Sequence, residues 1–220
     1  PERLTNKLFI QQMEEIQLSF IAVDEAHCIS EWGQDFRPSY QNIKDFRKNN
    51  PEITCLALTA TATPKVLDEI KNKLELKNPQ IFQKSFKRDN IKIFSEEVSD
   101  KYQKIFNILK YAKESGIIYV RTRKEAELLT EFLHRHNIQN VNYFHAGLST
   151  KEKNERQNFW NSSDQNVLIS TNAFGMGIDK DNVRFVIHFS PSQSIENYYQ
   201  EIGRAGRDGK KSYAFMLWNQ

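Results

Sequence analysis

Two carboxylates and an imidazole lie within the stretch DEAH, residues 24–27, directly after the apolar run at residues 18–23. Such a run predicts a buried strand, and α/β folds bind ligands at the carboxyl ends of their parallel strands. In phosphoryl transfer an aspartate at that position can hold Mg²⁺ through water, and an adjacent carboxylate can activate the attacking water. Asp24 and Glu25 fit these two roles. The alternative is that the two residues only cap the helix that follows.

Aromatic and cationic residues follow the carboxylates in the stretch CISEWGQDFRPSY, residues 28–40. Trp32 and Phe36 offer flat faces on which nucleic-acid bases can stack, and each such stack contributes ~1–3 kcal/mol. Arg37 can pair with a phosphate or stack on a base. The alternative is a surface loop whose two aromatic side chains pack onto the sheet.

Two glycine-containing stretches further along the chain also have ligand-binding character. In STNAFGMGIDK, residues 170–180, Gly175 and Gly177 allow a tight turn after a strand, and Asp179 can accept from a ribose or orient an arginine. Taken alone, this pattern is also typical of an ordinary turn.

The stretch QEIGRAGRDG, residues 200–209, places Arg204 and Arg207 three positions apart. If a helix persists there, the two guanidinium groups share one face, and Gly203 and Gly206 allow a ligand to approach closely. Such a pair suits a clamp for the negative charge on a transferred phosphoryl group. The alternative is a solvated basic turn.

The composition narrows the class of protein. At 220 residues, with 39% hydrophobic and 27% charged residues, the chain reads as soluble and globular, with one large domain or two small ones. No apolar run approaches the ~20 residues of a membrane span, so no membrane partner is expected. Cys28 and Cys55 form no C-x-x-C pair, which predicts a reducing compartment and no zinc site in this chain. A net charge of +3 is too small to indicate nucleic-acid binding by itself.

Strands and helices alternate along the chain. Short apolar runs predict strands at residues 18–23, 53–58, 91–94, 117–120, 141–144, 167–170, 184–189 and 212–217. Amphipathic patterns predict helices at residues 101–113, 124–136, 150–160 and 194–202. This alternation predicts an α/β fold with parallel sheets and right-handed crossovers. Residues 79–90, which break the periodicity, are interpreted as a linker between a truncated domain at residues 1–78 and a complete one at residues 91–220.

Together and in this order, these stretches resemble the helicase core of RecQ-family DNA helicases, in the second helicase superfamily. DEAH resembles motif II, LALTATA at 56–62 motif III, IIYVRTR at 117–123 motif IV, STNAFGMGIDK motif V and QEIGRAGRDG motif VI. PERL at 1–4 matches the short motif ahead of the box. The aromatic-rich loop distinguishes RecQ enzymes from other members of the superfamily. The resemblance implies RecA-like parallel sheets with helices on both faces, in a partial first domain and a complete second one.

The resemblance also implies roles for individual residues. Catalysis and its metal would fall to Asp24 for Mg²⁺ through water, Glu25 as general base, and Arg204 and Arg207 at the ATP γ-phosphate. Support of the nucleotide site would fall to His27, Gly177, Asp179 and Gln200. Contact with nucleic acid, and its coupling to ATP, would fall to Trp32, Phe36, Arg37, Thr59, Thr61, Arg123, His145 and Thr171. His27 would also link the box to motif III. Asp179 occupies a position that is often Asn in bacterial relatives, and HAGL at 145–148 has the alternative of simply shaping a turn.

The implied function is an ATP-dependent 3′–5′ DNA helicase, with ATP and Mg²⁺ as cofactors and single-stranded and partially duplex DNA as partners. It would couple ATP hydrolysis to translocation and unwinding in recombination and repair. The expected location is cytoplasmic and nucleoid-associated in a bacterium, or nuclear in a eukaryote. Two alternatives stay open: another superfamily 2 translocase or RNA helicase, and a nucleic-acid-binding module without ATPase activity.

One expected motif is absent from the 220 residues, the phosphate-binding loop G-x-x-x-x-G-K-[ST]. This chain alone is therefore expected to hydrolyse ATP negligibly. In the family's topology the strand of that loop lies beside residues 53–58. Without it an apolar edge is left unpaired, and self-association without a physiological role is expected there.

Overall fold

The computed structural model describes residues 1–31, 36–60, 62–85, 87–171 and 180–219. The chain divides into two compact units, Pro1–Lys84 and Ser85–Gln220, and the division falls within the predicted linker at residues 79–90. Among the described residues between the last helix of the first unit and the first strand of the second, neither helix nor strand forms.

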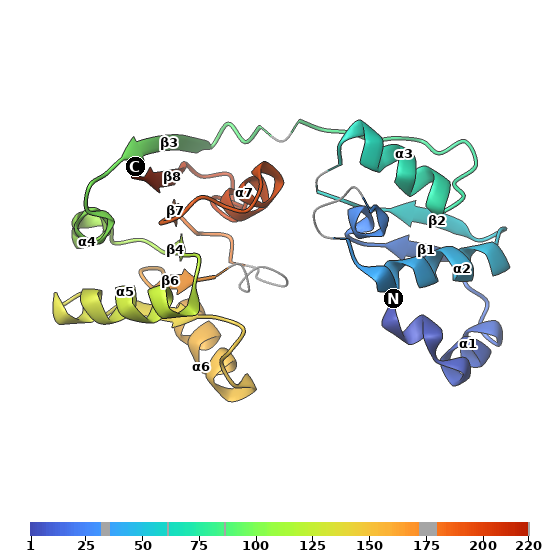
Figure 1. Ribbon diagram of the computed structural model, residues 1–220, viewed down its shortest axis with the longest axis horizontal. Helices are drawn as coiled ribbons and strands as arrows, with labels where there is room; N and C mark the ends of the chain where they lie inside the picture. The colour runs from blue at the N-terminus through green and yellow to red at the C-terminus, as the bar shows by residue number, and fades with distance from the viewer. Residues whose placement is uncertain (32–35, 61, 86, 172–179, 220) are drawn as a thin grey trace. The chain divides into compact units, whose positions relative to one another are not determined.

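The second unit is built on a six-stranded sheet in the order β3-β8-β7-β4-β6-β5 (Figure 1). Every pair of neighbouring strands in it runs parallel. The strands are β3 (Ile91–Glu97), β4 (Gly116–Tyr119), β5 (Val141–Phe144), β6 (Val167–Ser170), β7 (Phe185–His188) and β8 (Ser212–Trp218). The predicted parallel α/β architecture is confirmed.

In the described residues of this unit the connecting helices are α4 (Lys101–Tyr111), α5 (Arg123–Arg135), α6 (Thr150–Asn161) and α7 (Ile195–Ile202). Each begins at a residue whose side chain accepts a backbone N–H of the first turn, namely Asp100, Thr122, Ser149 and Ser194. Such caps satisfy donors that a helix leaves unpaired at its start. They fix where α5 and α6 start, at the predicted site residue Arg123 and just after the predicted site residue His145.

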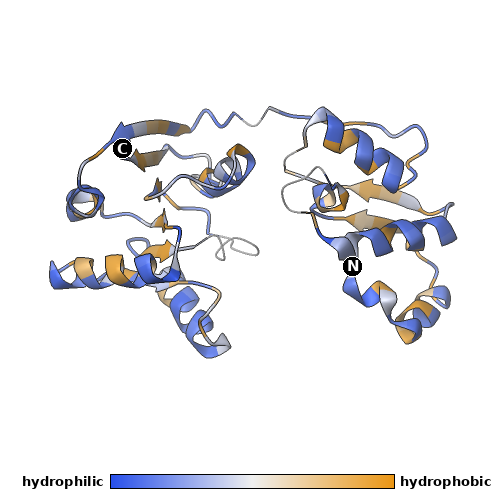
Figure 2. Ribbon diagram, in the orientation of Figure 1, coloured by the Kyte–Doolittle hydropathy of each residue, from blue (hydrophilic) through white to orange (hydrophobic). Residues whose placement is uncertain are grey.

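The sheet of the second unit is buried on both faces. Alternate residues of a strand point to opposite faces, and in β4 Ile117 packs in one core cluster with Trp160 of α6, whereas Ile118 packs in another with Leu129 of α5. In Figure 2, α5 carries both hydrophobic and hydrophilic bands, as expected of a helix with one buried side. Helices therefore cover both faces, as in the predicted RecA-like arrangement.

Strand β3 extends three residues beyond the predicted end at residue 94, because β8 pairs with it over its whole length, from Ile91 to Glu97. As an edge strand it is mostly exposed, so Ser95, Glu96 and Glu97 can belong to it without burying a charge. A pattern based on apolar residues alone ends the strand too early.

The first unit has a small parallel sheet in which β1 (Phe20–Val23) pairs with β2 (Thr54–Ala57). Around it lie α1 (Lys7–Glu14), α2 (Gln41–Asn49), α3 (Pro64–Lys73) and the short 3-10 helices η1 (Glu2–Thr5), η2 (Ala26–Ile29) and η3 (Pro38–Tyr40). Its core gathers Val23 and Ile29 with Ile70 and Leu74 of the α3 region. The two predicted strands are confirmed, with slightly shorter bounds.

The small sheet leaves apolar side chains exposed. Phe20, Leu56 and Leu58 have exposed fractions of 58%, 48% and 47%, and within the described ranges β2 pairs only with β1. We expect the isolated 220-residue chain to self-associate through this edge, since unpaired apolar strands invite pairing with another copy. Sedimentation at increasing concentration should show larger species that Leu56→Lys reduces. Leu128→Lys, at a 44% exposed position on α5, is the matched control. A wild-type chain that stays monomeric contradicts the expectation.

Candidate functional site

The two carboxylates of DEAH follow directly after β1, at its carboxyl end. Glu25 has a left-handed backbone with φ 47° and ψ 44°, a conformation that costs a non-glycine residue about 1–3 kcal/mol. Neighbouring hydrogen bonds hold it in place: Ala26 N donates to Leu58 O over 2.8 Å, and the Tyr40 hydroxyl donates to Asp24 O over 3.1 Å. The surrounding fold therefore enforces a sharp turn that redirects the Glu25 side chain.

The Glu25 carboxylate is only partly satisfied. Its Oε2 atom is buried and accepts no hydrogen bond from the described part of the chain, although His27 Nδ1 lies 3.4 Å away. The side chain makes no capping bond to η2. The Glu25 side chain therefore does not cap η2, and its buried oxygen is left without a hydrogen-bond donor among the described residues.

Asp24 is exposed, and its Oδ1 atom accepts the backbone N–H of Glu25 over 2.9 Å. A carboxylate oxygen is the ligand type that Mg²⁺ prefers, and Mg²⁺ is commonly held by one or two carboxylates together with waters and substrate phosphates. Across the described residues no group of three or more potential metal ligands gathers. Asp24 therefore fits a Mg²⁺ ion whose other ligands are waters and the phosphates of a nucleotide.

His27 connects the box to the stretch LALTATA. Its Nδ1 atom lies 2.8 Å from Thr59 Oγ1, across 32 positions of sequence, and the imidazole is 7% exposed. Cys28 Sγ lies 3.8 Å from His27 Nε2, on the other side of the ring. The structure thus brings together three of the predicted site residues: Glu25, His27 and Thr59.

The end of the aromatic-rich loop rests against α3. Phe36 is half-buried, with Lys73 Nζ 5.9 Å from its ring centroid, and Arg37 is exposed, with its backbone N donating to Cys28 O over 2.9 Å. Lys73 Nζ also donates to Ile29 O over 3.1 Å and to a carboxylate oxygen of Glu31 over 3.0 Å. Lys73 therefore holds both flanks of the loop, a role that its position in a plain amphipathic helix does not predict.

In the second unit the two arginines do not share a helical face. Helix α7 ends at Ile202, and Gly206 has a φ of +58°, which is incompatible with a continuing right-handed helix. Arg204 is half-buried and Arg207 is exposed. The helix on which a shared face depends does not persist, because the chain turns sharply through the glycine-containing stretch.

Arg204 is tied to the sheet through Tyr119, the last residue of β4. The two side chains form a hydrogen bond, while burial raises the pKa of the Tyr119 hydroxyl. Next to them, His188 Nε2 lies 2.7 Å from Glu201 Oε2, and the His188 ring stacks on Tyr119 with centroids 5.4 Å apart. Gln200, also predicted, is half-buried on α7 beside Glu201. The roles of Tyr119, His188 and Glu201 are absent from the sequence-based prediction, although a histidine within an apolar strand was a usable signal.

A further group of predicted residues lies where β4 and β5 end. A Cβ atom on Gly147 would come within 2.7 Å of Arg123 Nη1 and 3.3 Å of His145 Nδ1, so these three residues are in close contact. His145 Nε2 lies 3.0 Å from Glu127 Oε1, and its buried Nδ1 has no hydrogen-bond partner within the described ranges. The HAGL stretch also forms a turn, since Leu148 N donates to His145 O over 3.2 Å. The turn and the side-chain cluster are therefore compatible.

Thr171 follows β6 and is 8% exposed, with its N donating to Phe144 O over 3.4 Å. It lies at the same carboxyl edge of the sheet as His145. Four predicted site residues lie outside the described residues: Trp32, Thr61, Gly177 and Asp179.

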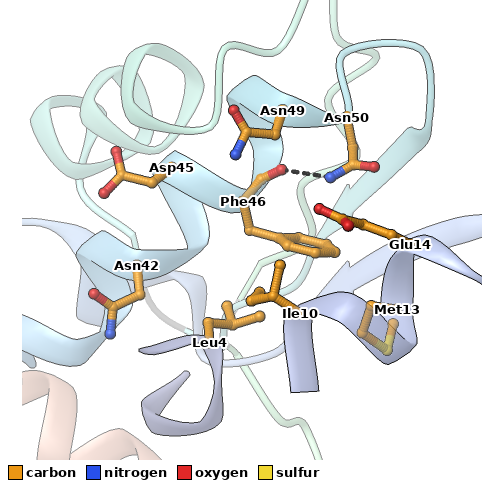
Figure 3. Close-up of a pocket in the computed structure, with 9 residues that line it drawn as sticks. All are labelled: Leu4, Ile10, Met13, Glu14, Asn42, Asp45, Phe46, Asn49 and Asn50. Carbon is orange, nitrogen blue, oxygen red and sulfur yellow. Dashed lines mark hydrogen bonds between the residues drawn. The ribbon is translucent and has the colours of Figure 1, made fainter. Parts of the chain in front are cut away.

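A pocket of about 170 Å³ lies in the first unit between α1 and α2 (Figure 3). Leu4, Ile10, Met13 and Phe46 form its apolar side, and Asn50 Nδ2 donates to Phe46 O over 2.9 Å at its rim. Of the predicted site residues that the structure describes, none lines it. In the described part of the chain, no helix has the length and apolar character that crossing a membrane requires.

Two family models match the chain. The model described as DEAD/DEAH box helicase matches residues 1–70, and the model described as helicase conserved C-terminal domain matches residues 100–209. Among solved structures, Saccharomyces cerevisiae Dbp5 bound to RNA and ADP BeF3 is similar with a TM-score of 0.75 at 22% identity, over 97% of this chain and 57% of that chain. That likeness supports the fold alone.

Curated relatives are more similar in sequence. The chain is 42% identical to the ATP-dependent DNA helicase RecQ of Bacillus subtilis, over 100% of this chain and 37% of the relative. It is 43% identical to the ATP-dependent helicase SGS1 of Saccharomyces cerevisiae, over 92% of this chain and 14% of the relative. The chain thus spans much less than half of either relative. With the ordered motifs and the two family models, these matches confirm the resemblance, and the chain belongs to the RecQ family of DEAD/DEAH-box helicases in superfamily 2.

Proposed function

We propose that this chain is the part of a RecQ-type ATP-dependent DNA helicase in which ATP hydrolysis is coupled to single-stranded DNA. The observation that carries the proposal is the series Glu25, His27 and Thr59, which joins a buried unsatisfied carboxylate oxygen to motif III through contacts of 3.4 Å and 2.8 Å. A carboxylate of this kind can take a proton from water, and a connection of this kind can transmit DNA binding to it.

The proposed chemistry assigns one task to each charged residue. Asp24 would hold Mg²⁺ together with the nucleotide, and when bound the ion offsets charge on the phosphates. Glu25 orients and deprotonates the attacking water. Arg204 and Arg207 stabilise the negative charge that develops on the transferred phosphoryl group. His27, Gln200, Gly177 and Asp179 support the nucleotide site.

The proposed DNA contacts use both units. Trp32, Phe36 and Arg37 sense the strand by stacking and by pairing with phosphates. Thr59 and Thr61 relay that contact to the nucleotide. Arg123, His145 and Thr171 contact the DNA backbone, and alternate closing and opening would move the strand in the 3′–5′ direction.

The isolated chain is proposed to be inactive. Its 220 residues contain no phosphate-binding loop, so neither backbone N–H groups nor a lysine of that loop can hold the β- and γ-phosphates. The activity proposed above belongs to the protein in its full natural length. Assays of turnover therefore use the full-length protein.

A second candidate is an RNA helicase. The chain is 42% identical, over 100% of its length, to a protein of Acanthamoeba polyphaga mimivirus named putative ATP-dependent RNA helicase R290. The aromatic-rich loop favours DNA, because it is the feature that distinguishes RecQ enzymes within the superfamily.

The two candidates differ in which nucleic acid stimulates ATP hydrolysis. We expect single-stranded DNA to raise the hydrolysis rate of the full-length protein much more than RNA of the same sequence and length. The measurement is steady-state ATP hydrolysis at saturating nucleic acid. Equal or greater stimulation by RNA would favour the RNA helicase, and no stimulation by either would favour a binding module without ATPase activity.

A further inference from the structure

The segment just ahead of β3 is hydrogen-bonded to the turn that carries the two arginines. Arg88 Nη2 donates to the carbonyl of Gly206 over 2.7 Å, and Asn90 Nδ2 donates to the same carbonyl over 2.8 Å. The Asn90 amide nitrogen also donates to Lys210 O over 3.0 Å. The same carbonyl also accepts the Gly209 N–H over 3.0 Å, so it is shared by one local backbone donor and by two side chains 116 and 118 positions away in sequence. Asn90 therefore connects the two ends of the turn at residues 206–210.

The fit of this contact depends on Gly206. Its φ of +58° is left-handed, and a Cβ atom there would lie 2.5 Å from Asn90 Nδ2 and 2.6 Å from Ser212 Oγ. Gly206 N donates to Val183 O over 2.8 Å, which also holds the preceding peptide group in place. The Asn90 amide thus occupies the space that any other residue at 206 would need for its side chain.

Arg88 and Asn90 are themselves held by the sheet. Arg88 Nε donates to Asn90 Oδ1 over 3.3 Å, Ile91 N donates to Arg88 O over 3.0 Å, and Ser212 N donates to Asn90 O over 2.8 Å. Ile91 and Ser212 begin the paired strands β3 and β8, so the backbones of Arg88 and Asn90 are hydrogen-bonded to the sheet. The sheet therefore fixes where Arg88 and Asn90 lie, and these two residues in turn fix where the turn lies.

An ion pair braces the other side of the same turn. Arg184 Nη2 lies 2.7 Å from Asp208 Oδ2, and Arg184 Nη1 donates to Ser212 Oγ over 3.1 Å. Lys210 N donates to Asp208 Oδ1 over 3.1 Å. Exposed Arg207 lies between the two braced residues, Gly206 and Asp208, so its backbone is fixed although its side chain faces solvent.

We propose that Arg88 and Asn90 are positioning residues for Arg204 and Arg207. By donating to the Gly206 carbonyl, they hold both guanidinium groups in the position for contact with the transferred phosphoryl group. The inference rests on the proposed function, which gives the arginines their task. It adds that two residues at the end of the predicted linker, outside the helicase motifs, set the efficiency of hydrolysis. A purely structural role would make the two residues matter for stability and leave turnover unchanged in folded protein.

Asn90→Asp separates the two roles chemically. It keeps the size and shape of the side chain but replaces both donor bonds with a carboxylate oxygen facing two carbonyl oxygens, of Gly206 and Lys210. A positioning role predicts that Asn90→Asp lowers kcat more than Asn90→Ala does. A space-filling role predicts the opposite order. Lys87→Met is the matched control, because Lys87 is an adjacent cation whose side chain is 80% exposed and pairs only with Asp89 among the interactions described.

The experiment has two readouts on the full-length protein. The first is hydrogen exchange at the Gly206 and Gly209 amides, which donate within this turn region, compared with amides of β4 and β6. The second is DNA-stimulated ATP hydrolysis resolved into kcat and KM. We expect Asn90→Asp to speed exchange in the turn only, to lower kcat about 10- to 100-fold through misplacement of the arginines, and to leave KM for ATP nearly unchanged. Wild-type kcat in a variant with a loosened turn would overturn the proposal.

Asn90→Asp could speed hydrogen exchange throughout the sheet, and variants of Arg88 then provide the test. Arg88→Met should then lower kcat, and Arg88→Lys, which retains a charged donor, should restore part of it. Equal kcat in these two variants would overturn the positioning role. If the wild-type protein hydrolysed no ATP, the proposed function would fail, and the exchange readout alone would decide whether Arg88 and Asn90 brace the turn.

Discussion

Glu25→Gln in the full-length protein is expected to lower the rate of ATP hydrolysis by roughly 10²–10⁴-fold, the contribution typical of a general base. The amide is nearly the same size as the carboxylate but cannot take a proton from water. Nucleotide binding should persist, because the substitution leaves Asp24 and the backbone turn unchanged. The measurement is single-turnover hydrolysis together with the affinity for a fluorescent ATP analogue.

The same variant is expected to lose turnover without losing thermal stability. Glu25 Oε2 is buried without a hydrogen-bond partner among the described residues, so replacing it with a neutral group should not lower the melting temperature. Glu52→Gln, at an exposed position away from the site, is the control and should keep wild-type turnover. An equal loss of ATP affinity and turnover in Glu25→Gln would contradict the general-base role.

Arg207→Ala is expected to lower kcat about 10³-fold or more, the range for arginines that stabilise a transferred phosphoryl group. Its side chain is exposed, so the substitution should change stability little and KM for ATP only slightly. The measurement is steady-state hydrolysis at saturating DNA. Arg135→Ala, at an exposed arginine on α5, is the matched control.

Arg204 should respond differently from Arg207. Arg204→Ala removes the hydrogen bond to buried Tyr119, and leaving a buried polar group without its partner costs about 1–3 kcal/mol. Both turnover and stability should therefore fall in Arg204→Ala, whereas Arg207→Ala loses turnover alone. If Arg207→Ala kept wild-type kcat, its assignment to the phosphoryl group would be wrong.

Much of the fold could be predicted from local pattern. The strands at residues 141–144 and 167–170 have the predicted bounds: the residues of the second are buried throughout, and in the first the two end residues are buried and the two central ones half-buried. For edge strand β3 the apolar pattern predicts an end at residue 94, because the last residues of the strand are polar and only their pairing with β8 identifies them. The pattern of apolar residues thus identifies buried strands well and exposed edge strands poorly.

The candidate site could be predicted only in part, because its remaining contacts join residues far apart in sequence. His27 and Thr59 were predicted through their motifs, and the structure places them together. The clamp from Asn90 to Gly206 spans 116 positions, and its donor lies in a stretch whose composition indicates only a linker. No local pattern encodes that contact.

The coupling proposed for the full-length protein is that residues of this chain link ATP hydrolysis to directional movement on DNA. Its most direct test is strand separation of a partial duplex by the full-length protein, with a single-stranded tail at either the 3′ or the 5′ end. We expect ATP-dependent separation of the 3′-tailed duplex only, and binding without separation for Glu25→Gln. Separation of the 5′-tailed duplex alone, or undiminished separation by Glu25→Gln, would contradict it.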